Sequence, residues 1–167
     1  DIDTMPRSAR PYLPRTRPRP NTPPGVFLFV AIRHELTRLT GKIVEHFQNL
    51  ASPRRYADVV ALDEELEKFR KDIPDIYRVD KAPDGSGPDT NKEFDSVCPW
   101  LPLHRYLLNI EYHYVRIALH RPYVLRNSEK YSHSRKAAFE SAKTDRRVRQ
   151  EYRKDVKWEP ERARKVH

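Results

Sequence analysis

The chain is short of cysteine, glycine and long apolar runs. A single cysteine, Cys98, excludes an internal disulfide framework and a multi-cysteine zinc site within these 167 residues. With only four glycines, the chain contains no glycine-rich loop of the kind that holds phosphates. No apolar stretch approaches the roughly 18–20 residues that span a bilayer, so we expect no membrane association. The first residues do not resemble a signal peptide, and the lack of an initial methionine leaves two interpretations open, a piece of a longer protein or a truncated form of one.

What the chain has in excess is proline and positive charge. Seven of the fifteen prolines lie in residues 1–25, where alternating arginine and proline favour an extended arm. The net charge of +9 is uneven, with +3 in residues 1–25, +7 in residues 126–167 and −1 between them. Basic ends on a neutral body are a weaker sign of nucleic-acid binding than a basic body.

Apolar periodicity between the two ends predicts an all-α fold, an irregular array of about four main helices. We expect the first helix to begin near Thr22 and the second at Ser52-Pro53 and to end at Pro74. The third helix, about residues 102–121, is apolar on two faces, so Leu103 to Leu119 should form an interior rod with the other helices around it. A fourth helix should start at Ser132.

The expected buried stripe of the second helix is Val59, Leu62, Leu66 and Phe69, and its expected solvent face is Asp63, Glu64, Glu65, Glu67 and Lys68. The organisation is then an arm over 1–25, a helical segment over 26–145 and a charged helix or tail over 146–167.

Few residues suggest chemistry. His113 and His120 share a helix face but are two turns apart, too far to hold one ion, so packed histidines are preferred over a metal site. Ser132, His133 and Ser134 are neighbours at a helix start, where serine usually caps, so we expect no nucleophile and no enzyme. Arg121 should donate to carbonyls at the end of the third helix rather than bind an acidic ligand. Aromatic rings are usually core, but five of them are candidates for a pocket between helices: Tyr106, Tyr112, Tyr114, Tyr123 and Phe139.

The order of several segments resembles the regulatory middle homology domain of fungus-specific zinc-cluster transcription factors. The most distinctive match is Leu119-His120-Arg121-Pro122, followed by the Ser134-Arg135 segment of the next helix. Weaker matches are Asp1-Ile-Asp-Thr-Met-Pro, the helix from Ile32, and the Leu62-Asp-Glu-Glu-Leu segment before Ile73-Pro. Together they cover about residues 1–6 and 26–145. Full-length relatives read DNA through a separate cluster of six cysteines holding two zinc ions, which this chain lacks.

The resemblance implies a nuclear, non-DNA-reading regulatory segment that acts through a small effector or protein partners, with a homodimer as one possibility. It implies no cofactor in this chain, and DNA contact only through a missing domain. An effector bound between helices would favour one packing over another. The alternatives left open are a nucleic-acid-binding module that uses the basic ends, Arg7 to Arg19 and Arg146 to Arg153, and a helical protein-interaction module.

Overall fold

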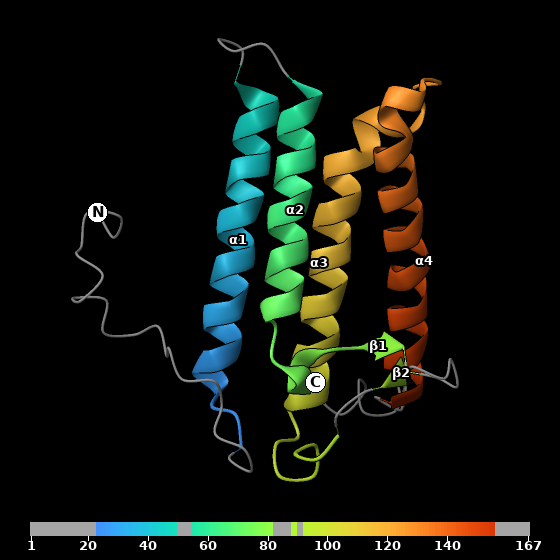
Figure 1. The fold of residues 1–167 in the computed structure, drawn as a ribbon. Coiled ribbons are helices and arrows are strands. Elements are labelled where there is room, and N and C mark those ends of the chain that lie inside the picture. Colours follow the sequence, from blue (N-terminus) through green and yellow to red (C-terminus); the bar gives the residue numbers. More distant parts are fainter. Residues whose placement is uncertain (1–22, 50–54, 82–87, 90–91, 156–167) are drawn as a thin grey trace, which may run out of the picture.

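The computed structural model describes residues 23–49, 55–81, 88–89 and 92–155. Four long helices dominate this part of the chain: α1 (Val26–Gln48), α2 (Tyr56–Asp72), α3 (Leu101–Val124) and α4 (Ser132–Asp155). They run alternately up and down, side by side (Figure 1). The remaining elements are two 3-10 turns, η3 (Asp75–Tyr77) and η4 (Glu129–Tyr131), and a two-residue antiparallel ladder of β1 (Asp80–Lys81) with β2 (Pro88–Asp89). The predicted all-α fold is confirmed.

Helix α3 is the centre of the array and touches each of the other three helices. Its face with Leu108, Tyr112 and Leu119 is buried in the main core, against Leu36 of α1 and Leu66 of α2. A smaller cluster of Val79, Tyr106 and Val148 lies between the linker, α3 and α4. Val148 is fully buried, so burial on α4 extends into the segment 146–167 that was expected to be a charged helix or tail.

The rod from Leu103 to Leu119 is buried on one face only. The stripe with Leu103, Leu107 and Tyr114, expected to be interior, is partly exposed: Tyr114 is 68% exposed, and Leu103 and Leu107 are 40% and 38% exposed. The reason is the number of neighbours, because the three helices that contact α3 cover this stripe only in part. Tyrosine and leucine on such a face are common at protein surfaces.

Helix boundaries differ from the sequence prediction at three points. Helix α1 begins at Val26 with Gly25 as its N-cap, not near Thr22, because Thr22 and Pro23 each precede a proline and are disfavoured in the α region. Helix α2 begins at Tyr56, and Ser52-Pro53 lie outside the described residues. Helix α3 continues through Pro122 to Val124.

The irregular segment between α2 and α3 is held by buried polar side chains of α3. Arg105, fully buried, donates to the carbonyl of Ile76 at 2.8 Å and forms a two-pronged ion pair with Asp95. Asn109 donates to the carbonyl of Tyr77 at 2.7 Å. Cys98 and Leu101 pack the end of this segment into the main core, whereas Val97 beside them is exposed. These bonds fix where α3 starts and therefore how its polar side chains meet α2 and α4.

Candidate functional site

A cluster of buried polar side chains joins α2, α3 and α4 near the connection between α3 and α4. We call it the Asp63 cluster; its members are Asp63 of α2, Arg116 and His120 of α3, and His133 and Ser134 of α4. Arg116 and His120 are four residues apart, so both side chains lie on the same face of α3. His133 and Ser134 stand in the first turn of α4, which the tight α3–α4 connection places beside His120.

Asp63 and Arg116 form the centre of this cluster. The guanidinium of Arg116 donates from Nε to Oδ1 of Asp63 at 2.7 Å and from Nη2 to Oδ2 at 3.0 Å. Asp63 is only 2% exposed and Arg116 8%. Arg116 also pairs with Glu67 one turn further along α2, and Tyr112 donates its hydroxyl to Glu67 at 3.1 Å. Two-pronged pairs of this kind are strong and fix geometry as well as charge.

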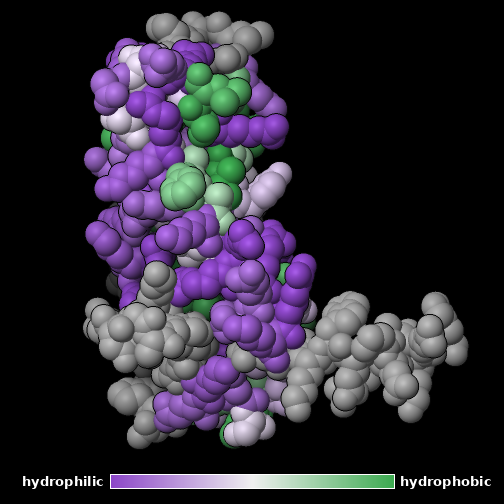
Figure 2. Space-filling model, turned by 90° about the vertical axis from the view of Figure 1, so that its right-hand side faces the viewer, coloured by the Kyte–Doolittle hydropathy of each residue, from purple (hydrophilic) through white to green (hydrophobic). Residues whose placement is uncertain are grey.

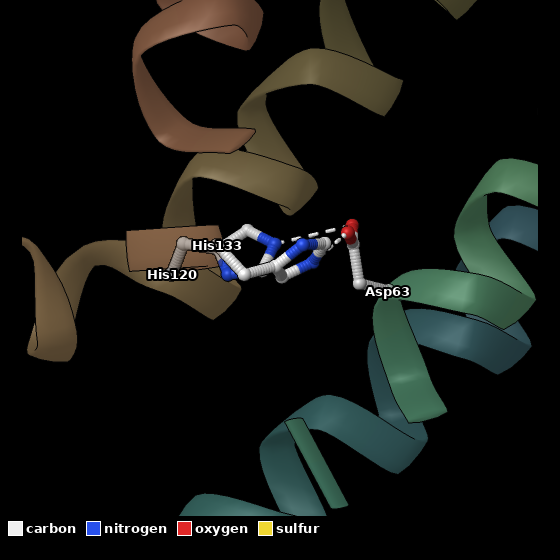
Figure 3. Close-up of side chains that lie close together, drawn as sticks. All are labelled: Asp63, His120 and His133. Atoms are coloured by element: carbon white, nitrogen blue, oxygen red, sulfur yellow. Dashed lines mark hydrogen bonds and ion pairs between the residues drawn. The ribbon is translucent and has the colours of Figure 1, made fainter. Parts of the chain in front are cut away.

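Both histidines of the cluster face the carboxylate of Asp63 (Figure 3). Nε2 of His120 lies 3.1 Å from Oδ1, and Nε2 of His133 lies 2.8 Å from Oδ2. On its other side, Nδ1 of His120 is hydrogen-bonded to the Ser134 hydroxyl at 2.9 Å. That hydroxyl also contacts the Tyr56 hydroxyl at 2.9 Å, and Tyr56 in turn accepts from the Ser134 amide. One chain of polar contacts thus crosses three helices.

The electrostatics of the cluster favour a charged Asp63. Burial by itself raises the pKa of this carboxyl, but the contacts with His120 and Arg116 and the charge of Arg116 outweigh it and hold the pKa well below its ordinary value of 3.8. For Arg116, burial lowers the pKa, but the bond to Asp63 together with the charges of Tyr112, Asp63 and Glu67 outweighs burial and raises the pKa. Each charge therefore depends on the other, because a lone buried charge is costly.

The cluster brings together ligand types that bind transition metals. One nitrogen from each histidine and one oxygen of Asp63 all lie within 4.8 Å of one another. Zinc accepts such ligands at about 2.0–2.2 Å. However, Arg116 already donates to both oxygens of Asp63, and a divalent ion on either oxygen would sit beside that guanidinium. The residues therefore fit an internal ion-pair cluster better than a metal centre, and the sequence prediction of no metal stays a prediction.

Ser134, His120 and Asp63 also stand in the order of a nucleophile, a base and an orienting acid. The serine is completely buried, and its hydroxyl contacts both Tyr56 and His120. A substrate carbonyl cannot approach Oγ in this arrangement. What the arrangement can do is hold α2 and α4 in one register on α3.

Asp63 was predicted to lie on the solvent face of α2, and that prediction is wrong; this is the main reason why the sequence did not reveal the cluster. Asp63 follows Val59 by four residues and precedes Leu66 by three, and both are fully buried, so its position belongs to the buried stripe. That spacing was the available signal. No local pattern indicates the partner Arg116, because 53 residues separate the two.

The residues that carry the family resemblance are now placed. Leu119, His120 and Ser134 are fully buried, whereas Arg121 and Pro122 are exposed on the last turns of α3. The prediction for Arg121 is wrong: among the described residues, its side chain makes no hydrogen bond to a carbonyl at the end of α3. Arg135 takes the expected role instead, donating to the carbonyls of Arg126 and Ser128 at 2.9 and 2.8 Å.

The structure does not bring the five candidate pocket rings together. Tyr112 and Tyr123 belong to the main core, and Tyr106 belongs to the smaller cluster with Val148. Tyr114 and Phe139 are exposed, at 68% and 71%. This distribution counts against one pocket lined by all five rings.

Comparison with family models, with curated proteins and with solved structures finds no match to this chain. None of the helices in the described part combines the length and the apolar character needed to cross a membrane.

Proposed function

We propose that this chain is a regulatory segment of a fungal transcription regulator that acts in the nucleus by binding a small effector or a protein partner. The observation that carries the proposal is the 2.9 Å bond between His120 and Ser134. These residues belong to the two segments on which the sequence resemblance chiefly rests, and both are completely buried. Because the two segments of the motif are in contact in the core, we infer that the motif contributes to specifying the fold.

The proposed mechanism is a shift between two packings of α2 and α4 on α3. The Asp63 cluster suits this role because it is a network of polar contacts shared by three helices. Separating one charged group from the network would leave its partner buried and unpaired, which is costly. Such a network favours one arrangement over small displacements. A ligand or partner that binds a second arrangement more tightly would shift the population towards it.

A reporter assay in yeast tests this proposal. The full chain is placed between an unrelated DNA-binding domain and an activation domain, and reporter output is compared with a fusion that carries a flexible linker of equal length. We expect the chain to lower the output, and Asp63→Asn to relieve that restraint. The matched control is Glu64→Gln, at the exposed neighbouring position. Output equal to the linker fusion, and unaffected by Asp63→Asn at equal protein abundance, would refute the proposal.

The nucleic-acid alternative retains one supporting observation. Helix α4 carries eight lysines and arginines against four acidic residues, and Lys136, Arg146 and Arg153 are exposed. The basic arm expected over residues 1–25 lies almost wholly outside the described residues. If this alternative holds, DNA affinity of the chain should fall with salt by a slope of about −0.9 per phosphate contacted.

A further inference from the structure

A groove lined by α2, α3 and α4 lies beside the Asp63 cluster. Its volume is about 490 Å³, within the range of about 300–1,000 Å³ that is usual for small-molecule sites. Helix α2 contributes Arg70, α3 contributes His113 and Arg116, and the rest of the lining comes from residues 140–150 of α4. We call it the basic groove. Figure 2, which views the molecule from the side of α4 in Figure 1, shows a mostly hydrophilic face.

Positive charge exceeds negative charge in this groove. Arg70, Lys143, Arg146 and Arg147 line it, and Glu140 is the one carboxylate among the lining residues. Arg116 adds little to the excess, because its charge is balanced by Asp63 and Glu67. Cations gathered from two helices around a concave surface attract anions more strongly than the same charges on an open surface.

Three polar atoms in the groove lining are buried without a hydrogen-bond partner among the described residues. They are Nδ1 of His113, Oγ of Ser141 and Nη1 of Arg147. His113 is 2% exposed and Ser141 1%. Buried polar groups are rarely left unpaired in folded proteins, so three at one groove need an explanation. The three atoms come from two helices and line the same concavity, which points to a shared partner.

The chemistry of these atoms defines that partner. A guanidinium N–H and a serine hydroxyl donate hydrogen bonds, and a neutral imidazole donates from Nδ1 in one of its two tautomers. Burial, together with the charges of Arg70, Arg116 and Arg147, lowers the pKa of His113 to about 3, so its imidazole is neutral. These hydrogen-bond donors lack an acceptor and are surrounded by cations, so the oxygens of a carboxylate or a phosphate are suitable partners for them.

We propose that the basic groove binds a small molecule bearing a phosphate or carboxylate group, held by Arg147, Ser141 and His113. Lys143 and Arg146, which also line the groove, are exposed. The three polar atoms are buried, so the side chains around them must move before an oxyanion reaches them, and a DNA backbone would meet the exposed cations alone. Arg116 lines the groove and also holds Asp63, so a bound anion competes for the residue at the centre of the cluster. That this ligand acts as the effector rests on the proposed regulatory function, whereas its binding does not.

Titration calorimetry on the full chain tests the site. Inorganic phosphate and succinate are added separately at constant ionic strength, with sodium chloride as the reference salt. We expect saturable binding of at least one of them and none of chloride, and the comparison shows which oxyanion the groove prefers. Arg147→Gln should weaken binding at least tenfold, and Ser141→Ala severalfold. Arg153→Gln, an exposed position on the same helix outside the groove, is the matched control and should leave affinity unchanged.

Several outcomes would overturn this proposal. One is the absence of saturable binding for both anions; another is equal weakening by Arg147→Gln and Arg153→Gln, which would indicate diffuse attraction. DNA binding that both variants weaken equally, without binding of either small anion, would indicate a nucleic-acid surface instead. Because Arg147 also donates to the carbonyl of Val79, its variant can fail to fold. If it does, Ser141→Ala, which removes only a single hydroxyl, replaces it as the test of the site. Anion binding without any restraint in the reporter assay would retain the site and reject the regulatory function.

Discussion

At the scale of single residues, Asp63 decides how three helices meet. Its carboxylate takes two bonds from Arg116 and faces both His120 and His133. Asp63→Asn keeps the size and removes the charge, which leaves Arg116 buried with only Glu67 as an acidic partner. Breaking a buried pair in this way typically costs about 3–5 kcal/mol. We therefore expect the free energy of unfolding, measured by urea denaturation, to fall by about that amount.

The control for this prediction is the next residue along α2. Glu64 is exposed, and Glu64→Gln should change the unfolding free energy by less than about 0.5 kcal/mol. If both variants lost the same small amount, Asp63 would contribute no more than an ordinary surface charge, and the cluster could not hold the helices in register.

At the scale of elements, the sequence predicted the helices far better than their ends and contacts. Apolar residues at three- and four-residue steps identify all four helices, because burial of one stripe is a local property of the chain. The end of α3 was misplaced because Pro122 usually stops a helix, whereas α3 continues two residues beyond it, to Val124. The exposed stripe with Tyr114 was misplaced because the pattern cannot reveal how many neighbours a helix has.

The candidate site was less predictable than the fold. The spacing of Asp63 from Val59 and Leu66 placed it among buried positions, but its partners lie on other helices at separations of 53 to 70 residues. The basic groove likewise combines Arg70 of α2 with residues of α3 and α4. Sequence periodicity reports which face of one helix is buried; it carries no information on which faces meet.

Gly41 gives a prediction about helix α1. It lies within the helix, and a Cβ added there would have nothing within 4 Å, so no close approach of another helix requires glycine. Gly41→Ala should therefore stabilise the chain by about 1 kcal/mol through reduced freedom of the unfolded backbone. Thermal denaturation should show a higher midpoint. Gly25 is the control: its surroundings are equally open, but it is the N-cap, where alanine is disfavoured, so Gly25→Ala should give no gain.

At the scale of the whole molecule, the Asp63 cluster and the basic groove lie along one line, where α2, α3 and α4 meet. The Asp63 cluster joins α2 and α4 to α3 near the α3–α4 connection, and the basic groove continues further along the same helices, with Arg116 in both. The apolar core lies mainly on the side of α1 and α2. Buried polar contacts therefore gather where α2, α3 and α4 meet, and contacts of this kind respond to pH and to ions.

This arrangement predicts loss of stability in mild acid. Burial and the charges of Arg70, Arg116 and Arg147 lower the pKa of His113 from 6.5 to about 3. Between these values the unfolded chain binds a proton at His113 and the folded chain does not, so stability rises with pH and falls on acidification. From pH 7 to pH 5 the loss should be about 2 kcal/mol. Asp63 adds a second loss below its ordinary pKa of 3.8, because its folded value is lower still.

Urea denaturation at pH 7, 6 and 5, in cationic buffers free of phosphate and carboxylate, measures this dependence. Glu140, the one carboxylate among the groove-lining residues, can also titrate. It is retained in every variant, so its contribution to the pH dependence is common to all of them. His113→Gln should reduce the fall in stability from pH 7 to pH 5, because glutamine does not titrate. His34→Gln, at an exposed position of α1, should retain it. An equal fall in the wild-type chain and in His113→Gln would mean that His113 takes up its proton in the folded state, and the groove would then present an imidazolium rather than a neutral donor. Phosphate added at pH 5 should restore part of the stability lost on acidification if the groove binds it, which links this measurement to the proposed site.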